Sequence, residues 1–184
     1  MKKLLIATLL SAFALSAHSQ VYVQADLGSS RVALEDEAGG EDVISGTVFT
    51  QRLSVGYDFQ NNFRVAVDYT NYGRVKEDYT TYTESMKFKS LGVTGFYDFT
   101  PINLLTPYLG LRLAYTKADL KYSSRSSYFN YQDSYSDSSL GLGIMAGAQY
   151  KLTNNVSLNA NLEYNRVASN AFAAGANIGI KYSF

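Results

Sequence analysis

The chain contains no cysteine and no tryptophan, and it has only 2 prolines and 1 histidine among its 184 residues. Without cysteine it forms neither disulfides nor thiolate metal sites, so an exported fold must be held together by other means. The single histidine is His18, which lies in the N-terminal segment interpreted below as a cleaved signal. Its loss excludes Ser-His-Asp and Cys-His hydrolases and any His-ligated metal centre. We therefore expect no enzyme, no cofactor, and no catalytic or metal-binding residues.

An excess of charge of one sign is also missing, because 16 basic residues balance 16 acidic ones. This balance argues against a nucleic-acid partner. One acidic cluster stands out, and it is either a weak calcium site or a solvated loop tip. The spaced ligand pattern of a dedicated calcium loop is missing, which favours the solvated tip. The cluster contains Glu35, Asp36, Glu37, Glu41 and Asp42.

The longest apolar run, residues 4–15, follows Lys2 and Lys3 and precedes the small residues Ala17 and Ser19. A membrane-spanning helix needs about 20 apolar residues, so this run is too short to cross a bilayer. A positive start, an apolar centre and a small-residue site are typical of a signal peptide. We predict a signal peptide at residues 1–19 and one domain at residues 20–184. The mean hydropathy of −0.13 excludes further helical spans but suits strands that are only half apolar.

The rest of the chain alternates between apolar and polar residues with a period of two. In residues 52–59, for example, Leu53, Val55 and Tyr57 share one face, while Ser54 and Asp58 share the other. Such alternation predicts strands with one apolar and one polar face. It recurs at 21–28, 52–59, 63–70, 91–99, 109–116, 140–150, 156–165 and 176–184, with Phe96 as an exception on a polar face.

We expect these segments to form an all-β, eight-stranded antiparallel transmembrane barrel, with strands of about 11 residues. Short and long connections alternate, as they do between the periplasmic turns and the extracellular loops of such barrels. The short ones are residues 60–62, 100–106 and 152–155, and the long ones include 34–46, 71–85 and 121–138.

Two observations favour a membrane barrel over a soluble β-sandwich, although alternation alone leaves both open. The polar faces carry mostly small residues, which suit a narrow lumen, and the apolar faces carry aromatic residues near the strand ends, as interfacial girdles do. The charges on the polar faces are nearly balanced, which indicates pairing inside the lumen. Symmetric pairing about Asn61 places Asp58 opposite Arg64 and Arg52 diagonal to Asp68. The predicted lumen charges are Asp26, Arg52, Asp58, Arg64, Asp68, Asp98, Arg112, Glu163 and Lys181.

Several segments also resemble the opacity family of porins. They are Leu53-Ser54-Val55-Gly56-Tyr57-Asp58-Phe59, Asn62-Phe63-Arg64-Val65-Ala66-Val67-Asp68-Tyr69, Ser90-Leu91-Gly92-Val93, Tyr97-Asp98-Phe99 and Ile180-Lys181-Tyr182-Ser183-Phe184. The resemblance implies an eight-stranded protein in the outer membrane of mucosal Gram-negative bacteria. Its best-known members are adhesins that bind host receptors through surface loops. The final Phe184 is similar to the signal that the barrel-assembly machinery reads, so that machinery is an expected partner.

Outer-membrane lipid and lipopolysaccharide are further expected partners, together with a host-cell receptor or glycan met by the long loops. Tyrosine and serine in these loops resemble a recognition surface, although strands that simply protrude beyond the bilayer explain the pattern equally well. The candidate contacts are Tyr72, Arg74, Lys76, Tyr79, Tyr82, Arg125, Tyr128, Phe129 and Tyr131. We rank surface adhesin or structural barrel first, a narrow diffusion channel second and a membrane enzyme last, since eight strands leave a lumen filled by side chains.

Overall fold

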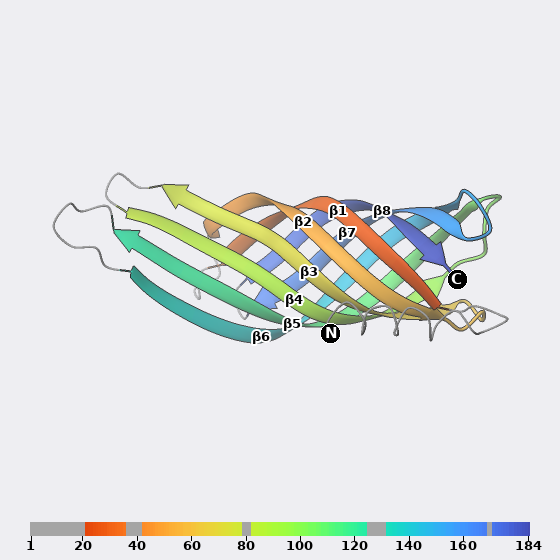
Figure 1. The fold of residues 1–184 in the computed structure, drawn as a ribbon, viewed down its shortest axis with the longest axis horizontal. Helices are drawn as coiled ribbons and strands as arrows, with labels where there is room; N and C mark the ends of the chain where they lie inside the picture. The colour runs from red at the N-terminus through yellow and green to blue at the C-terminus, as the bar shows by residue number, and fades with distance from the viewer. Residues whose placement is uncertain (1–20, 36–41, 79–81, 125–131, 169–170) are drawn as a thin grey trace, which may run out of the picture.

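The computed structural model describes residues 21–35, 42–78, 82–124, 132–168 and 171–184, which form eight strands. Each strand pairs antiparallel with the next, and β8 pairs with β1, so the sheet closes into a barrel (Figure 1). The predicted fold is thereby confirmed, whereas the predicted signal peptide lies outside the described residues. The described part contains no helix that is long and apolar enough to cross a membrane. The strands are β1 (Val21–Glu35), β2 (Asp42–Asp58), β3 (Phe63–Asp78), β4 (Tyr82–Asp98), β5 (Leu105–Ser124), β6 (Gln132–Lys151), β7 (Val156–Ala168) and β8 (Ala171–Ser183).

Residues that alternate between polar and apolar in the sequence alternate between the inner and the outer surface of the barrel wall. On β5, Arg112 and Ala114 are buried inside the barrel, whereas Leu109, Leu111 and Leu113 are 47–71% exposed on the outside. A large exposed apolar surface of this kind is unusual for a soluble domain and typical of a lipid-facing wall.

Tight turns connect the strands at one end of the barrel. Gln60 and Asn62 take positive φ values of 59° and 72° between β2 and β3, and Asp58 Oδ1 accepts a hydrogen bond of 2.8 Å from the Gln60 amide. The register places Asp58 opposite Arg64, as predicted. The C-terminus lies at the same end (Figure 1), where the Phe184 amide donates to the Val21 carbonyl at 3.1 Å.

At the opposite end the prediction of long loops at 34–46, 71–85 and 121–138 is largely wrong, because the strands continue through most of these residues. The strands are 13 to 20 residues long rather than about 11. The reason is that the alternation inverts here: Val48 and Phe88 are buried inside, while Thr47 and Lys89 are exposed outside. A barrel that leaves the bilayer must present polar residues outward, so the inversion marks the end of the lipid-facing wall.

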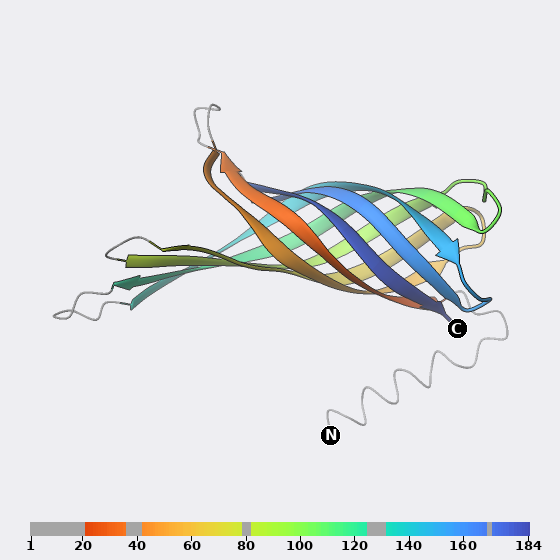
Figure 2. The same cartoon turned by 90° about the horizontal axis from the view of Figure 1, so that it is seen from above.

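Above the closed wall, the same end divides into the β1–β2 hairpin and a four-stranded sheet formed by β3 to β6. Pairing of β2 with β3 ends at Gln51 and Asn71, next to a bulge where Gly73 has a φ of 76° and its amide donates to Asn71 Oδ1 at 3.1 Å. A Cβ at Gly73 would lie 2.8 Å from the Phe49 carbonyl oxygen, so β3 needs glycine where it leaves β2. Figure 2 shows the β1–β2 hairpin turning away from the projecting parts of β3–β6. We call the latter, residues 72–78, 82–89, 117–124 and 132–138, the blade.

Candidate functional site

The middle of the lumen is filled by a network of ion pairs centred on Asp68. Arg112 donates to both carboxylate oxygens of Asp68, at 3.0 and 2.5 Å, and Thr70 donates to the same carboxylate at 2.9 Å. Arg52 lies diagonal to Asp68 at 3.8 Å and donates to Glu163 Oε2 at 2.5 Å across the lumen. All four charged side chains are no more than 5% exposed, so each ion depends on its partners in place of water.

A second cluster surrounds Arg64 near the tight turns. Its guanidinium forms a bidentate pair with Asp98, at 2.5 and 2.7 Å, although Asp58 is its neighbour in the register. The charged group also lies over three aromatic rings, with 4.6 Å to the centre of Phe96, 5.3 Å to Tyr108 and 5.5 Å to Tyr22. This contact explains why Phe96 interrupts a polar face, since its ring serves as a cation–π partner.

Two further buried charges use neutral partners: Asp26, which stands opposite Arg52 in the register, and Lys181, which lies near Tyr22. Asp26 accepts hydrogen bonds from Gln24 at 2.9 and 3.0 Å and from Asn159 at 2.8 Å. Lys181 donates to Gln149 and lies 5.3 Å from the ring centre of Tyr22. Amides and an aromatic ring are therefore the partners of these two charges.

An apolar cluster closes the lumen at the blade end. Its side chains are at most 6% exposed and belong to Val32, Val48, Tyr72, Phe88, Val167, Ala171 and Ala173. Below the cluster a void of about 10 Å³ is lined by Tyr22, Asp26, Arg52 and Asn161 among others. A single water needs about 10–15 Å³. The described side chains therefore fill much of the lumen, and this void is too small for more than one water.

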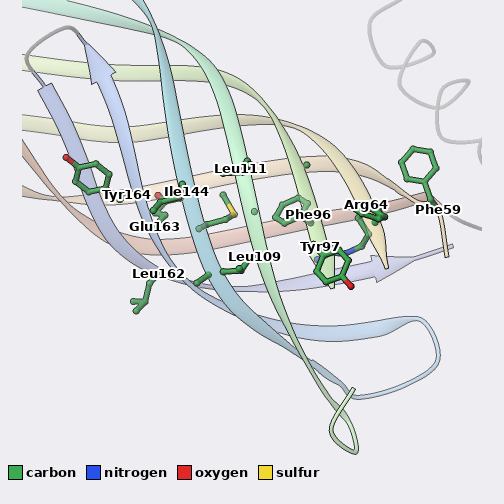
Figure 3. Close-up of a pocket in the computed structure, with 15 residues that line it drawn as sticks. Phe59, Arg64, Phe96, Tyr97, Leu109, Leu111, Ile144, Leu162, Glu163 and Tyr164 are labelled. Carbon is green, nitrogen blue, oxygen red and sulfur yellow. The ribbon is translucent and has the colours of Figure 1, made fainter. Parts of the chain in front are cut away.

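The outer wall is apolar and bounded by aromatic rings. Rings near the tight turns meet edge to face, with centres 5.2 Å apart for Phe63–Tyr97 and for Tyr97–Phe99. A groove of about 880 Å³ crosses β3 to β7 in this wall (Figure 3). It is hollowed where the small residues Gly95 and Ala146 stand among large ones. Because most of its exposed lining side chains are apolar and point outward, the groove belongs to the lipid-facing surface and is no entrance to the lumen.

Comparison with known proteins identifies the family. A family profile described as Opacity family porin protein matches residues 55–184. The chain belongs to the opacity porin family. An uncharacterised protein of Haemophilus influenzae is 47% identical to this opacity porin over 185 residues, 100% of both chains. Protein opa of the same species is 36% identical over 105 residues, 55% of this chain and 84% of its own.

Solved structures agree on the architecture. Neisserial surface protein A superposes with a TM-score of 0.69 and 30% identity, covering 90% of this chain and 98% of its own. Ail of Yersinia pestis superposes with a TM-score of 0.59 and 20% identity, covering 90% and 99%, which shows a shared fold. This opacity porin is an outer-membrane β-barrel, and proteins of its family are generally structural proteins or adhesins rather than enzymes. The tight-turn end therefore faces the periplasm, and the blade faces the outside of the cell.

The structure places the predicted lumen charges on the inner face of the wall. Asp26, Arg52, Arg64, Asp68, Arg112, Glu163 and Lys181 are buried, and Asp58 and Asp98 are partly exposed near the periplasmic end. The register of Asp58 and Arg64 is confirmed. The ion pair expected between them is wrong, because the Arg64 guanidinium binds Asp98, and Asp58 accepts a hydrogen bond from the Gln60 amide instead.

The structure does not place the predicted partner contacts together in loops. Tyr72 was a wrong choice: its side chain is 0% exposed and its hydroxyl accepts a hydrogen bond of 3.2 Å from Arg112 inside the lumen. Arg74 and Lys76 belong to β3 and Tyr82 to β4, so they stand on strands of the blade rather than in loops. Tyr79, Arg125, Tyr128, Phe129 and Tyr131 lie outside the described residues.

The sequence reasoning missed the apolar cluster that seals the lumen. Val48 shares a face with Thr50 and Arg52, so period-two counting could have continued past the predicted start of the strand at residue 52. The sequence pattern does not predict this cluster as long as apolar residues are placed only on the lipid-facing side.

The filled lumen predicts that the barrel conducts poorly. Purified, folded protein in planar bilayers should give little or no steady current, because arginine side chains and the apolar cluster occupy the path of an ion. A 16-stranded porin inserted into the same membrane serves as the positive control. Large, stable openings with every insertion would contradict the prediction.

Proposed function

We propose that this opacity porin is a surface recognition protein that acts in adhesion through the blade, and that its barrel is an anchor rather than a channel. The observation that carries the proposal is the projection of paired strands beyond the lipid-facing wall. On β5 the last outward tyrosine is Tyr115, yet the strand continues to Ser124 and pairs with β6 as far as Gln132.

The projection is long enough to present a surface above the membrane. The eight residues from Lys117 to Ser124 span about 27 Å at the usual rise of a strand. Pairing of β4 with β5 and of β5 with β6 is continuous, and β3 pairs with β4 on both sides of the bulge at Gly73, so the strands form one sheet. A sheet positions contact residues more rigidly than free loops do, which lowers the entropy lost on binding. A host-cell receptor or glycan is the proposed partner.

The competing function, a narrow diffusion channel, finds less support. Ion pairs cross the lumen from Arg52 on β2 to Glu163 on β7 at 2.5 Å, and the apolar cluster lies above them. A solute would have to break buried charge pairs to pass.

Shortening the blade tests the proposal. Lys117 pairs with Ser138 and Arg74 with Lys87, so an Asn-Gly turn can replace residues 118–137 or residues 75–86 and keep the register below. We expect bacteria that display either variant to lose most of the parent's adhesion to epithelial cells. Migration of heated and unheated samples on detergent gels checks that the barrel still folds.

The matched control shortens the β1–β2 hairpin, which is not part of the blade. Ala33 pairs with Ser45, so the same turn can replace residues 34–44. This variant should adhere as the parent does. Equal adhesion by all three folded variants, or none by the parent, would leave a structural barrel without a recognition role.

A further inference from the structure

Two lysines face each other on the outer wall just above the lipid-facing band. Lys89 on β4 is the direct cross-strand partner of Lys117 on β5, and both side chains are exposed. Direct neighbours on one face of a sheet have Cβ atoms about 4.5 to 5.5 Å apart, and like charges in that position repel. An anion bound between the two lysines would remove this repulsion and so stabilise the barrel.

The nearby charges do not neutralise the pair. Lys87 stands opposite Asp119 in the register, and Lys117 Nζ lies 3.8 Å from Asp119 Oδ1, with side chains 57% and 35% exposed. Asn71 flanks Lys89 and Ser138 flanks Lys117, and neither carries a charge. Three lysines thus share one half-buried carboxylate, which leaves a net positive patch.

The position of the patch relative to the apolar band indicates which anion can reach it. One cross-strand row below the two lysines come Leu91 and Tyr115, which are 57% and 53% exposed and belong to the apolar band. The lysines therefore stand at the level of the head groups of the outer leaflet, with hydrocarbon directly beneath them. Lysine is a strong partner for phosphate, and basic residues at a membrane surface attract anionic head groups.

We propose that Lys89 and Lys117, assisted by Lys87, form a binding site for the phosphate groups of lipopolysaccharide in the outer leaflet. The acyl chains of the same molecule would lie against Leu91 and Tyr115. This site lies at the base of the blade, on the side that faces the surrounding membrane. The variants that shorten the blade keep Lys87, Lys89 and Lys117, so the two proposals can fail independently.

A titration of the full-length, folded barrel in a zwitterionic detergent tests the site. Fluorescently labelled lipopolysaccharide is added, and the apparent Kd is read from its anisotropy. We expect Lys89→Gln and Lys117→Gln each to weaken binding on the order of fivefold, and the double variant about 25-fold. Lys89→Arg with Lys117→Arg should bind as the parent does, because both charges are kept.

The controls separate a site from general charge attraction. Lys151, an exposed lysine at the periplasmic end of β6, gives the matched variant Lys151→Gln, which should bind like the parent. Dephosphorylated lipopolysaccharide should bind the parent as weakly as the intact lipid binds the double variant. Inorganic phosphate alone should compete poorly, since it lacks acyl chains.

Four results would overturn the proposal. They are parent-like binding by a double variant that still shows heat-modifiable migration, an equal loss with Lys151→Gln, tight binding of the dephosphorylated lipid, and full displacement by inorganic phosphate. If the double variant does not fold, the single variants decide, because each removes one of two charges that repel in the unliganded barrel.

Discussion

Replacing Asp68 by asparagine should lower the free energy of unfolding by about 3 to 5 kcal/mol, the cost of leaving buried charges without their counter-ion. Asp68 receives two hydrogen bonds from Arg112 and one from Thr70, and it lies 3.8 Å from Arg52. Asparagine has nearly the same shape, so packing is kept while the negative charge is lost. Urea unfolding of the protein in lipid vesicles measures the difference.

The control is the same substitution at Asp119, whose ion pair with Lys117 is exposed. A surface pair is worth about 0 to 1 kcal/mol, so Asp119→Asn should have a small effect. Adding Arg112→Gln to Asp68→Asn should cost less than the two single changes together, because no unpaired guanidinium remains at that contact. Equal losses for Asp68→Asn and Asp119→Asn would show that the lumen network contributes no more than a surface pair.

This network also shows how far the sequence alone could lead. Alternation placed Arg52, Asp68, Arg112 and Glu163 on the inner face, because the period of a strand fixes which side each residue takes. It could not show that Arg52 binds Glu163, since these residues come from β2 and β7 and meet only across the closed lumen. Pairing depends on barrel geometry that no local pattern contains.

The hairpin at Asn61 shows that a correct register does not fix which ion pair forms. The register of β2 and β3 follows from the tight turn, and Asp58 indeed stands opposite Arg64. The guanidinium nevertheless turns to Asp98 on the next strand, where Phe96 and Tyr108 also contact it. A register predicts which residues are neighbours. Which of these neighbours a side chain binds depends on the sum of the contacts that it makes with all of them.

The blade was harder to predict because the rule behind the prediction changes at the membrane surface. Within the bilayer the outward residues are apolar, and beyond it they are polar while Val32, Val48 and Phe88 turn inward. Both arrangements obey a period of two, but their phases are opposite. A prediction that places apolar residues only on the outside therefore ends the strands too early, and it assigns Tyr72 to a loop although this residue belongs to β3.

Two glycines of the wall, Gly141 on β6 and Gly95 on β4, should respond in opposite ways to alanine, and this is the second large effect that we expect. Gly141 on β6 is buried, and a Cβ there would fall far inside van der Waals contact with the carbonyl oxygen of Arg166 on β7. The obstacle is backbone, which cannot rotate away as a side chain can. We expect Gly141→Ala to cost about 3 kcal/mol, the upper end of the usual penalty for overpacking, or to prevent folding.

Gly95 on β4 provides the matched control, because a Cβ there meets nothing within 4 Å. Alanine restricts the unfolded chain more than glycine does, so Gly95→Ala should stabilise the barrel by about 0.5 to 1 kcal/mol. The folded fraction on unheated detergent gels and the urea midpoint in lipid vesicles would measure both variants. Pairing of β6 with β7 is seen from Gly143 toward the periplasm, so Gly141 lies just beyond the paired region. If Gly141→Ala folds and unfolds as the parent does, β7 must stand further from β6 at this point. The close approach of the two strands would then not help to hold the barrel closed.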